Sequence, residues 1–85
     1  MITESVIDNL ATAVAKVGFS RAARAALQEA FAGVRLTFCL LDEMEASEPF
    51  RAYPGFSLFL VGASDHCIGL TSMLERAVGV VIAEE

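Results

Sequence analysis

The sequence predicts an α+β domain in which an N-terminal αα-hairpin packs on one face of a mainly antiparallel, four-stranded sheet. Apolar side chains recur at helical spacing as far as residue 31. From residue 34 they alternate at every second position, as strands do. Because 85 residues are enough for one domain only, we expect the helical hairpin (3–31) and the sheet part (34–83) to share a single core.

Two helices joined by a short turn are expected to form the hairpin. Over residues 3–17 the apolar side chains share one face, and Gly18 is placed to end the helix. Ser20 is placed to cap a second helix that runs to about Phe31. The side chains expected to be buried are Val6, Ile7, Leu10, Val14 and Val17 on the first helix, and Ala23, Leu27, Ala30 and Phe31 on the second.

Four strands are expected to follow, in the overall order ααβββ(α)β. They cover residues 34–41, 56–61, 66–70 and 78–83, with a turn of helix at 71–76 before the last strand. The second and third strands are close enough in sequence to pair as a hairpin. Residues 42–54 are interpreted as one long acidic loop.

Alternation assigns the strand side chains to two faces of the sheet. Those expected to face the helices are Val34, Leu36, Phe38, Leu40, Phe56, Leu58, Leu60, Ile68, Leu70, Val78, Val80 and Ile82. The opposite face, called the outer face below, holds Leu41, Phe59, Val61, Val81, Ala83 and both cysteines, Cys39 and Cys67. A solvated antiparallel face would carry polar residues at these positions.

Two interpretations of this apolar outer face stay open. Scattered apolar surface is normal on soluble proteins. Alternatively, a second copy or another protein covers Phe59, Val61, Val81 and Leu41. Hydrophobic residues make up 55% of the chain, more than in ordinary domains, so we expect a homodimer formed through the outer sheet face.

Charge and composition exclude several classes of partner. The net charge is −5, and the six Lys and Arg are scattered along the chain, whereas nucleic-acid binding needs them clustered. The longest uncharged run, 52–64, is shorter than a bilayer span. No secretory signal is visible. We therefore expect a cytoplasmic protein with no nucleic-acid or membrane partner.

The densest polar cluster is Ser64-Asp65-His66-Cys67, which contains the single histidine. Neighbouring side chains on a strand point to opposite faces, so His66 is poorly placed to activate Cys67 as a nucleophile. We therefore expect no catalytic residues and no enzyme.

A metal or redox site is the alternative hypothesis for this region. Its ligands would be Cys39, Cys67, His66 and Asp65, because the two cysteines share the outer face and a dimer would bring two such pairs together. Against it, there is no CxxC spacing, and buried cysteine usually serves as a small hydrophobe. No cofactor is expected.

Asp42, Glu43, Glu45 and Glu48 form an acidic run whose spacing does not match an EF-hand. Such a run is usually a solvated loop, and the alternative is docking to a basic partner. In the second case Asp42, Glu43 and Glu45 would steer the encounter while the outer face supplies the contact.

The strand region also carries a recognisable pattern. Gly33-Val34-Arg35-Leu36-Thr37-Phe38-Cys39 and Phe56-Ser57-Leu58-Phe59-Leu60-Val61 are followed by Asp65-His66-Cys67, by Leu70-Thr71 and by Ala77 to Glu84. Over roughly residues 31–84 this pattern resembles a small uncharacterised bacterial family encoded in nitrogen-fixation gene clusters. Leu41 departs from it, because a polar residue is expected at that position.

The resemblance implies a context and carries over no catalytic residues. Nitrogenase assembly handles iron, sulfur and molybdenum, so the resemblance adds weight to the metal hypothesis. It equally fits an acidic accessory protein that binds a larger partner. We expect a small non-enzymatic accessory or interaction protein associated with nitrogen fixation, with the metal-handling or redox protein as the alternative.

Overall fold

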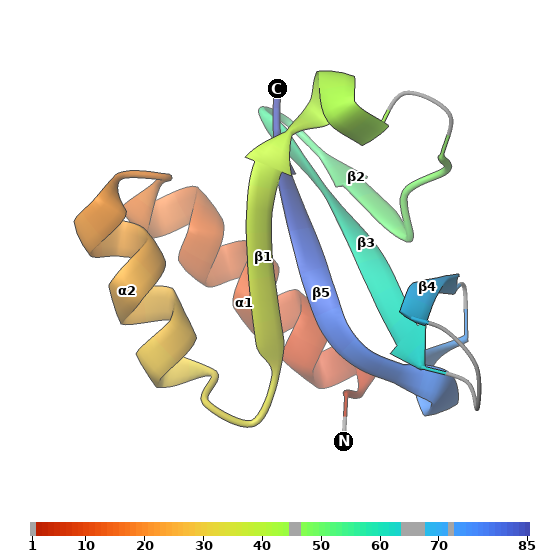
Figure 1. Ribbon diagram of the computed structural model, residues 1–85. Coiled ribbons are helices and arrows are strands. Elements are labelled where there is room, and N and C mark those ends of the chain that lie inside the picture. The colour runs from red at the N-terminus through yellow and green to blue at the C-terminus, as the bar shows by residue number, and fades with distance from the viewer. Residues whose placement is uncertain (1, 45–46, 64–67, 72) are drawn as a thin grey trace.

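The computed structural model of the protein describes residues 2–44, 47–63, 68–71 and 73–85. Two helices, α1 (Glu4–Val17) and α2 (Arg21–Ala30), precede a mixed sheet. Their apolar sides share one core with the sheet (Figure 1), which confirms the α+β class. The remaining elements are β1 (Arg35–Leu40), η1 (Leu41–Met44), β2 (Arg51–Tyr53), β3 (Phe56–Ala63), β4 (Ile68–Thr71), η2 (Leu74–Arg76) and β5 (Ala77–Glu84), where η1 and η2 are short 3₁₀ helices.

The two helices begin and end where the sequence predicts. The Thr3 hydroxyl accepts a hydrogen bond from the Val6 backbone N–H (3.3 Å), and the Ser20 hydroxyl accepts one from the Ala23 N–H (3.1 Å). These side chains satisfy backbone donors that a helix start leaves free. Gly18 ends α1 at φ +81°, a conformation that favours glycine.

The buried sides of the helices differ from the prediction at three positions. Ala11 is buried on α1, whereas Val17 in the last turn is 46% exposed. On α2 only Ala23 and Leu27 are buried, and Ala30 is exposed. The apolar stripe is therefore narrower than the sequence suggests.

The sheet has five strands and is mixed, which corrects the prediction of four mainly antiparallel strands. Its order is β1-β5-β3-β2, with β4 also pairing with β3. β5 is parallel to β1 and antiparallel to β3. The last strand thus lies between the first and third, a non-local pairing that alternation along the chain does not reveal. The expected hairpin of the second and third strands is confirmed as β3 and β4.

Two parts of the predicted acidic loop 42–54 form regular secondary structure. Asp42, Glu43 and Met44 belong to η1. Arg51–Tyr53 forms β2, which pairs antiparallel with β3. Three residues are too few to show an alternating pattern. The turn from β2 to β3 contains Gly55 at φ +89°.

Most side-chain positions on the helix-facing side are confirmed. Residues of β1, β3 and β5 join the core formed with the helices, namely Val34, Leu36, Phe38, Phe56, Leu58, Leu60, Val80 and Ile82. Leu40 and Val78 were also expected there but are 53% and 51% exposed. Val78 is the extra residue of a bulge, since Gly79 pairs with Val61 while Ala77 pairs with Gly62. A bulge re-aims the side chain it inserts.

The assignment of Leu70 to the helix-facing side is wrong. Leu70 lies directly opposite Val61 in the β3–β4 pair, and directly opposite residues share a face. Val61 belongs to the outer-face cluster. Leu70 therefore points to the outer side, where it is 45% exposed.

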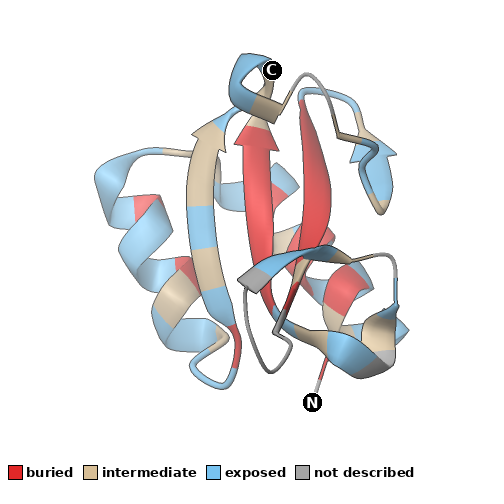
Figure 2. Ribbon diagram, turned by 45° about the vertical axis from the view of Figure 1, so that its right-hand side comes forward, coloured by how far each residue is buried: buried red, intermediate tan, exposed pale blue. Residues whose placement is uncertain are grey.

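The outer face is covered by the chain itself. Phe59 is 1% exposed and Val81 is 8% exposed, and both pack with Leu41 and Met44 of η1. Figure 2 shows that burial concentrates on β3 and β5, in the middle of the sheet. Because β1 and β2 lie on opposite sides of this pair, the connection between them has to cross the sheet, and η1 begins that crossing.

The open side of β1 is partly closed by a side chain of α2. The Gln28 carboxamide donates to the Val34 carbonyl (2.9 Å) and accepts from the Leu36 N–H (3.0 Å). It therefore pairs with the edge as a neighbouring strand would. The sequence places Gln28 on the solvent side of its helix, whereas here it satisfies backbone groups that would otherwise be open to another chain.

The contact of β1 with β5 leaves no room for a side chain at Gly79. A Cβ there would lie 2.7 Å from the Arg35 carbonyl oxygen and 3.2 Å from its Cβ. We expect Gly79→Ala to lower the free energy of unfolding by about 1–3 kcal/mol, because the strands must separate to admit the methyl group. Urea denaturation followed by circular dichroism measures this.

Gly69→Ala is the matched control. Gly69 is also a strand glycine, but a Cβ there meets nothing within 4 Å, so a change of about 0.5 kcal/mol or less is expected. Equal effects of the two substitutions would contradict the close approach of β1 and β5.

Candidate functional site

The residues expected to form an interaction face lie in two different environments. Phe59 and Val81 are buried beneath η1, and Leu41 and Val61 are half-buried around them. Their burial therefore needs no second copy of the chain. This removes the reason for placing a dimer contact on the outer face around Phe59 and Val81.

The acidic residues of η1 are accessible. Asp42 and Glu43 are exposed. They lie two and three residues after Leu40, which pairs with Glu84 at the end of β5. Figure 1 shows η1 and the C-terminus at the same end of the molecule. We call Leu40, Asp42, Glu43, Glu84 and Glu85 the acidic end. Glu45, also predicted to take part, lies outside the described residues.

Of the candidate metal ligands, the structure describes Cys39 only. Asp65, His66 and Cys67 lie outside the described residues. Within the described ranges, no group of three His, Cys, Asp or Glu side chains is placed to hold a metal ion. Cys39 packs against the outer-face cluster, the environment of a small hydrophobe rather than of a ligand.

Burial raises the pKa of the Cys39 thiol, and the negative charge of Glu43 raises it further. Both effects disfavour the thiolate, which is the form that binds metals and attacks electrophiles. The chemical character of Cys39 is therefore that of an unreactive thiol.

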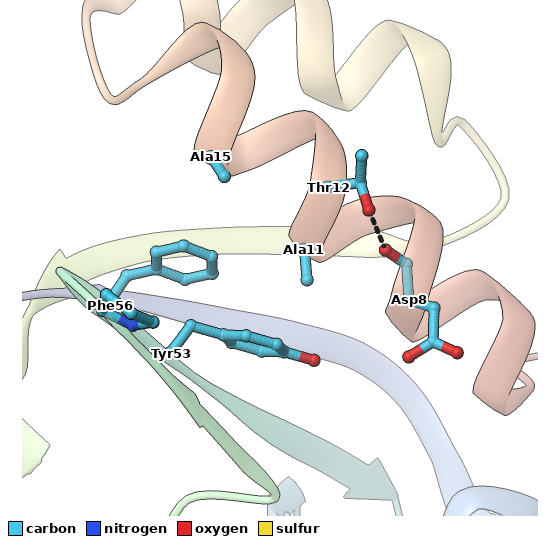
Figure 3. Close-up of a pocket in the computed structure, with 7 residues that line it drawn as sticks. Asp8, Ala11, Thr12, Ala15, Tyr53 and Phe56 are labelled. Atoms are coloured by element: carbon cyan, nitrogen blue, oxygen red, sulfur yellow. Dashed lines mark hydrogen bonds between the residues drawn. The ribbon is translucent and has the colours of Figure 1, made fainter.

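A groove lies between α1 and the β2–β3 turn. Its volume is about 460 Å³, within the range of small-ligand sites. Figure 3 shows α1 on one side and two aromatic rings on the other. The lining residues are Asp8, Ala11, Thr12, Ala15, Tyr53, Pro54 and Phe56.

The aromatic side of the groove is built from stacked rings. Tyr53 stacks on Phe56, with ring centroids 5.1 Å apart and an interplanar angle of 21°. Phe56 also meets Phe19 edge to face, at 6.0 Å. Phe56 is buried and Tyr53 is half-buried. The core therefore fixes the Phe56 ring, and the Phe56 ring supports the Tyr53 ring.

The helical side of the groove combines small side chains with one carboxylate. Ala11 and Ala15 leave the space open, and Asp8 lies at one end, where the Tyr53 hydroxyl also points (Figure 3). The Thr12 hydroxyl donates to the Asp8 backbone carbonyl (2.9 Å). Asp8 thus supplies the one carboxylate of a lining that is otherwise uncharged and mostly apolar.

Sequence reasoning did not find this groove. Asp8 and Thr12 are not among the apolar positions expected to be buried on the first helix, and Tyr53 falls within the segment interpreted as the acidic loop. The alanines at 11 and 15, one turn apart, are the only local signal, because they leave room beside a helix. Nothing local indicates that Tyr53 packs opposite them.

Comparison with known protein families, with curated proteins and with solved structures found no match. Among the described residues, no helix combines the length and apolar character needed to cross a membrane. Function is therefore argued from the residues themselves.

The Cys39 thiol gives the first chemical test. In a Cys67→Ser background, we expect alkylation by iodoacetamide to reach half its maximal rate at a higher pH in the folded chain than in urea. The reason is that a raised pKa leaves less thiolate at any given pH. Glu43→Gln is expected to lower the pH midpoint of alkylation in the folded chain, because it removes the negative charge that helps to raise the pKa of Cys39.

Glu29→Gln on α2 is the control substitution, and it is expected to leave the midpoint unchanged. A folded midpoint at or below that of the unfolded chain would show that Cys39 is an activated thiol, contrary to its packing.

Proposed function

We propose that the protein is a small non-enzymatic accessory protein that docks through its acidic end onto a basic surface of a larger protein. The observation that carries the proposal is the arrangement of that end. β1 and β5 run parallel, so both strands finish at the same edge of the sheet. The acidic residues that follow or end them are thereby brought together.

The acidic end combines one exposed apolar side chain with four acidic residues. Leu40 is 53% exposed, Asp42, Glu43 and Glu85 are exposed, and Glu84 is half-buried. An apolar centre with a polar rim is the usual anatomy of a protein interface. Charges of one sign around it steer a partner of the opposite sign and suppress other encounters.

The backbone holds this end in a defined shape. The Glu85 N–H donates to the Gly55 carbonyl (2.9 Å), and the Glu85 carboxylate accepts from the Gly55 N–H (3.1 Å). These bonds tie the last residue of the chain to the β2–β3 turn. A fixed surface loses less entropy on binding than a mobile one.

The resemblance of residues 31–84 to a family from nitrogen-fixation gene clusters supports placing the partner in nitrogen fixation, in the cytoplasm. A homodimer is a weaker proposal than the sequence suggests, since the chain covers Phe59 and Val81 by itself. The metal-handling alternative would need Asp65, His66 and Cys67. The raised pKa of Cys39 does not favour it.

Affinity capture from the native host under nitrogen-fixing conditions tests the proposal. We expect the wild-type chain and a Glu29→Gln control to retain a protein of nitrogen fixation. Asp42→Asn/Glu43→Gln should lose most of it, as should a wash in 1 M salt, where the screening length falls to about 3 Å. Leu40→Ser is expected to weaken the capture without changing its salt dependence.

Two results would count against this function. One is a capture that contains no nitrogen-fixation protein. The other is a captured protein whose retention is the same for the wild type and the neutralised variant, since docking would then not involve the acidic end.

A further inference from the structure

Two carboxylates of α1, Glu4 and Asp8, lie four residues apart and so fall on one side of the helix. Opposite Glu4, the Arg51 guanidinium approaches the Glu4 carboxylate (3.5 Å) and lies over the Phe50 ring at 4.9 Å from its centroid. The cation is thus held by a carboxylate from the helix and an aromatic ring from the segment leading into β2.

One turn further along α1, the same two partners recur without a cation. Asp8 supplies the carboxylate, and Tyr53, at the other end of β2, supplies the ring. Among the ion pairs between described residues, Arg51–Glu4 is present and Asp8 takes part in none. The groove in front of Asp8 and Tyr53 therefore combines a carboxylate of α1 with an aromatic ring of β2, as the Arg51 site combines Glu4 with Phe50 (Figure 3).

The dimensions of the groove suit one long side chain. Its length follows α1 from Asp8 to Ala15, seven residues or about 10 Å at 1.5 Å per residue. Ala11 and Ala15 would contact a methylene stem, and Asp8 lies where the stem ends. A guanidinium stacks on an aromatic face and pairs with a carboxylate through two parallel hydrogen bonds, which an ammonium cannot do.

We propose that this groove binds an arginine side chain of a partner protein, with the guanidinium on Asp8 and its plane against Tyr53. The proposal rests on the proposed function, in that the partner is a protein with a basic surface. It adds a second contact beside the β2–β3 turn, whose Gly55 is hydrogen-bonded to Glu85 of the acidic end. Charge complementarity selects this occupant, because Asp8 is the one charged side chain of a lining that is otherwise uncharged and mostly apolar.

A titration with the peptide acetyl-Gly-Arg-Gly-amide tests the site, followed by ¹H–¹⁵N correlation spectra of the ¹⁵N-labelled chain. We expect the largest shift changes at Ala11, Thr12, Ala15 and Tyr53, with millimolar affinity. The peptide with citrulline, the neutral isostere of arginine, should bind at least about fivefold more weakly, and so should the arginine peptide to Asp8→Asn. The same spectra show directly that each variant is folded.

Two further variants separate the contributions. Tyr53→Leu keeps an apolar surface but removes the ring face, and a loss of about threefold is expected. Asp42→Asn is the matched control at the acidic end, and its affinity for the peptide should equal that of the wild type.

Several outcomes would overturn the groove proposal. They are shift changes confined to the acidic end, equal binding of the citrulline peptide, unchanged affinity of Asp8→Asn, and no shift change up to about 20 mM peptide. Concentration-dependent shifts of the groove residues without peptide would also overturn it, because a second copy would then occupy the site. Shift changes confined to the acidic end would contradict the groove proposal but not the proposed function. A failed host capture together with peptide binding in the groove would contradict the proposed function but not the groove proposal.

Discussion

The insertion of β5 between β1 and β3 is the constraint on which the rest of the structure depends. β5 pairs with a strand on each side, and its residues Gly79 to Ala83 are buried. A strand in this position is shielded from water on both faces only if each face has a cover. α1 and α2 cover one face, and Leu41 and Met44 of η1 pack on the other.

The same insertion brings together the parts that carry the proposals. The parallel pairing of β1 and β5 puts the carboxyl ends of both strands at one edge, which creates the acidic end. It also displaces β2 to the far side of β3. There Arg51 reaches Glu4, and Tyr53 faces Asp8 across the groove. Both surfaces are consequences of strand order rather than of any sequence motif.

Local signals in the sequence are enough to predict the helices, most strand positions and much of the core. Thr3, Gly18 and Ser20 mark the helix ends through their own backbone and side-chain chemistry. Alternation identifies the helix-facing residues of β3 and, as far as Phe38, of β1. It fails at Val78, because a bulge breaks the two-residue period, and at Leu70, because the face of a short strand is set by its pairing register. β2 and the groove depend on how segments far apart in the sequence pack, such as α1 beside the β2–β3 turn, and no local pattern encodes this packing.

Sedimentation equilibrium of the wild-type chain tests most directly whether the molecule covers its own outer face. We expect a single species of 9.1 kDa up to about 100 µM, where a dimer of micromolar affinity would be populated. Leu41→Ser/Met44→Ser, which weakens the cover over Phe59, should associate at the same concentrations. A wild-type chain that sediments at twice its own mass, with no further association of the double variant, would contradict this account of the outer face.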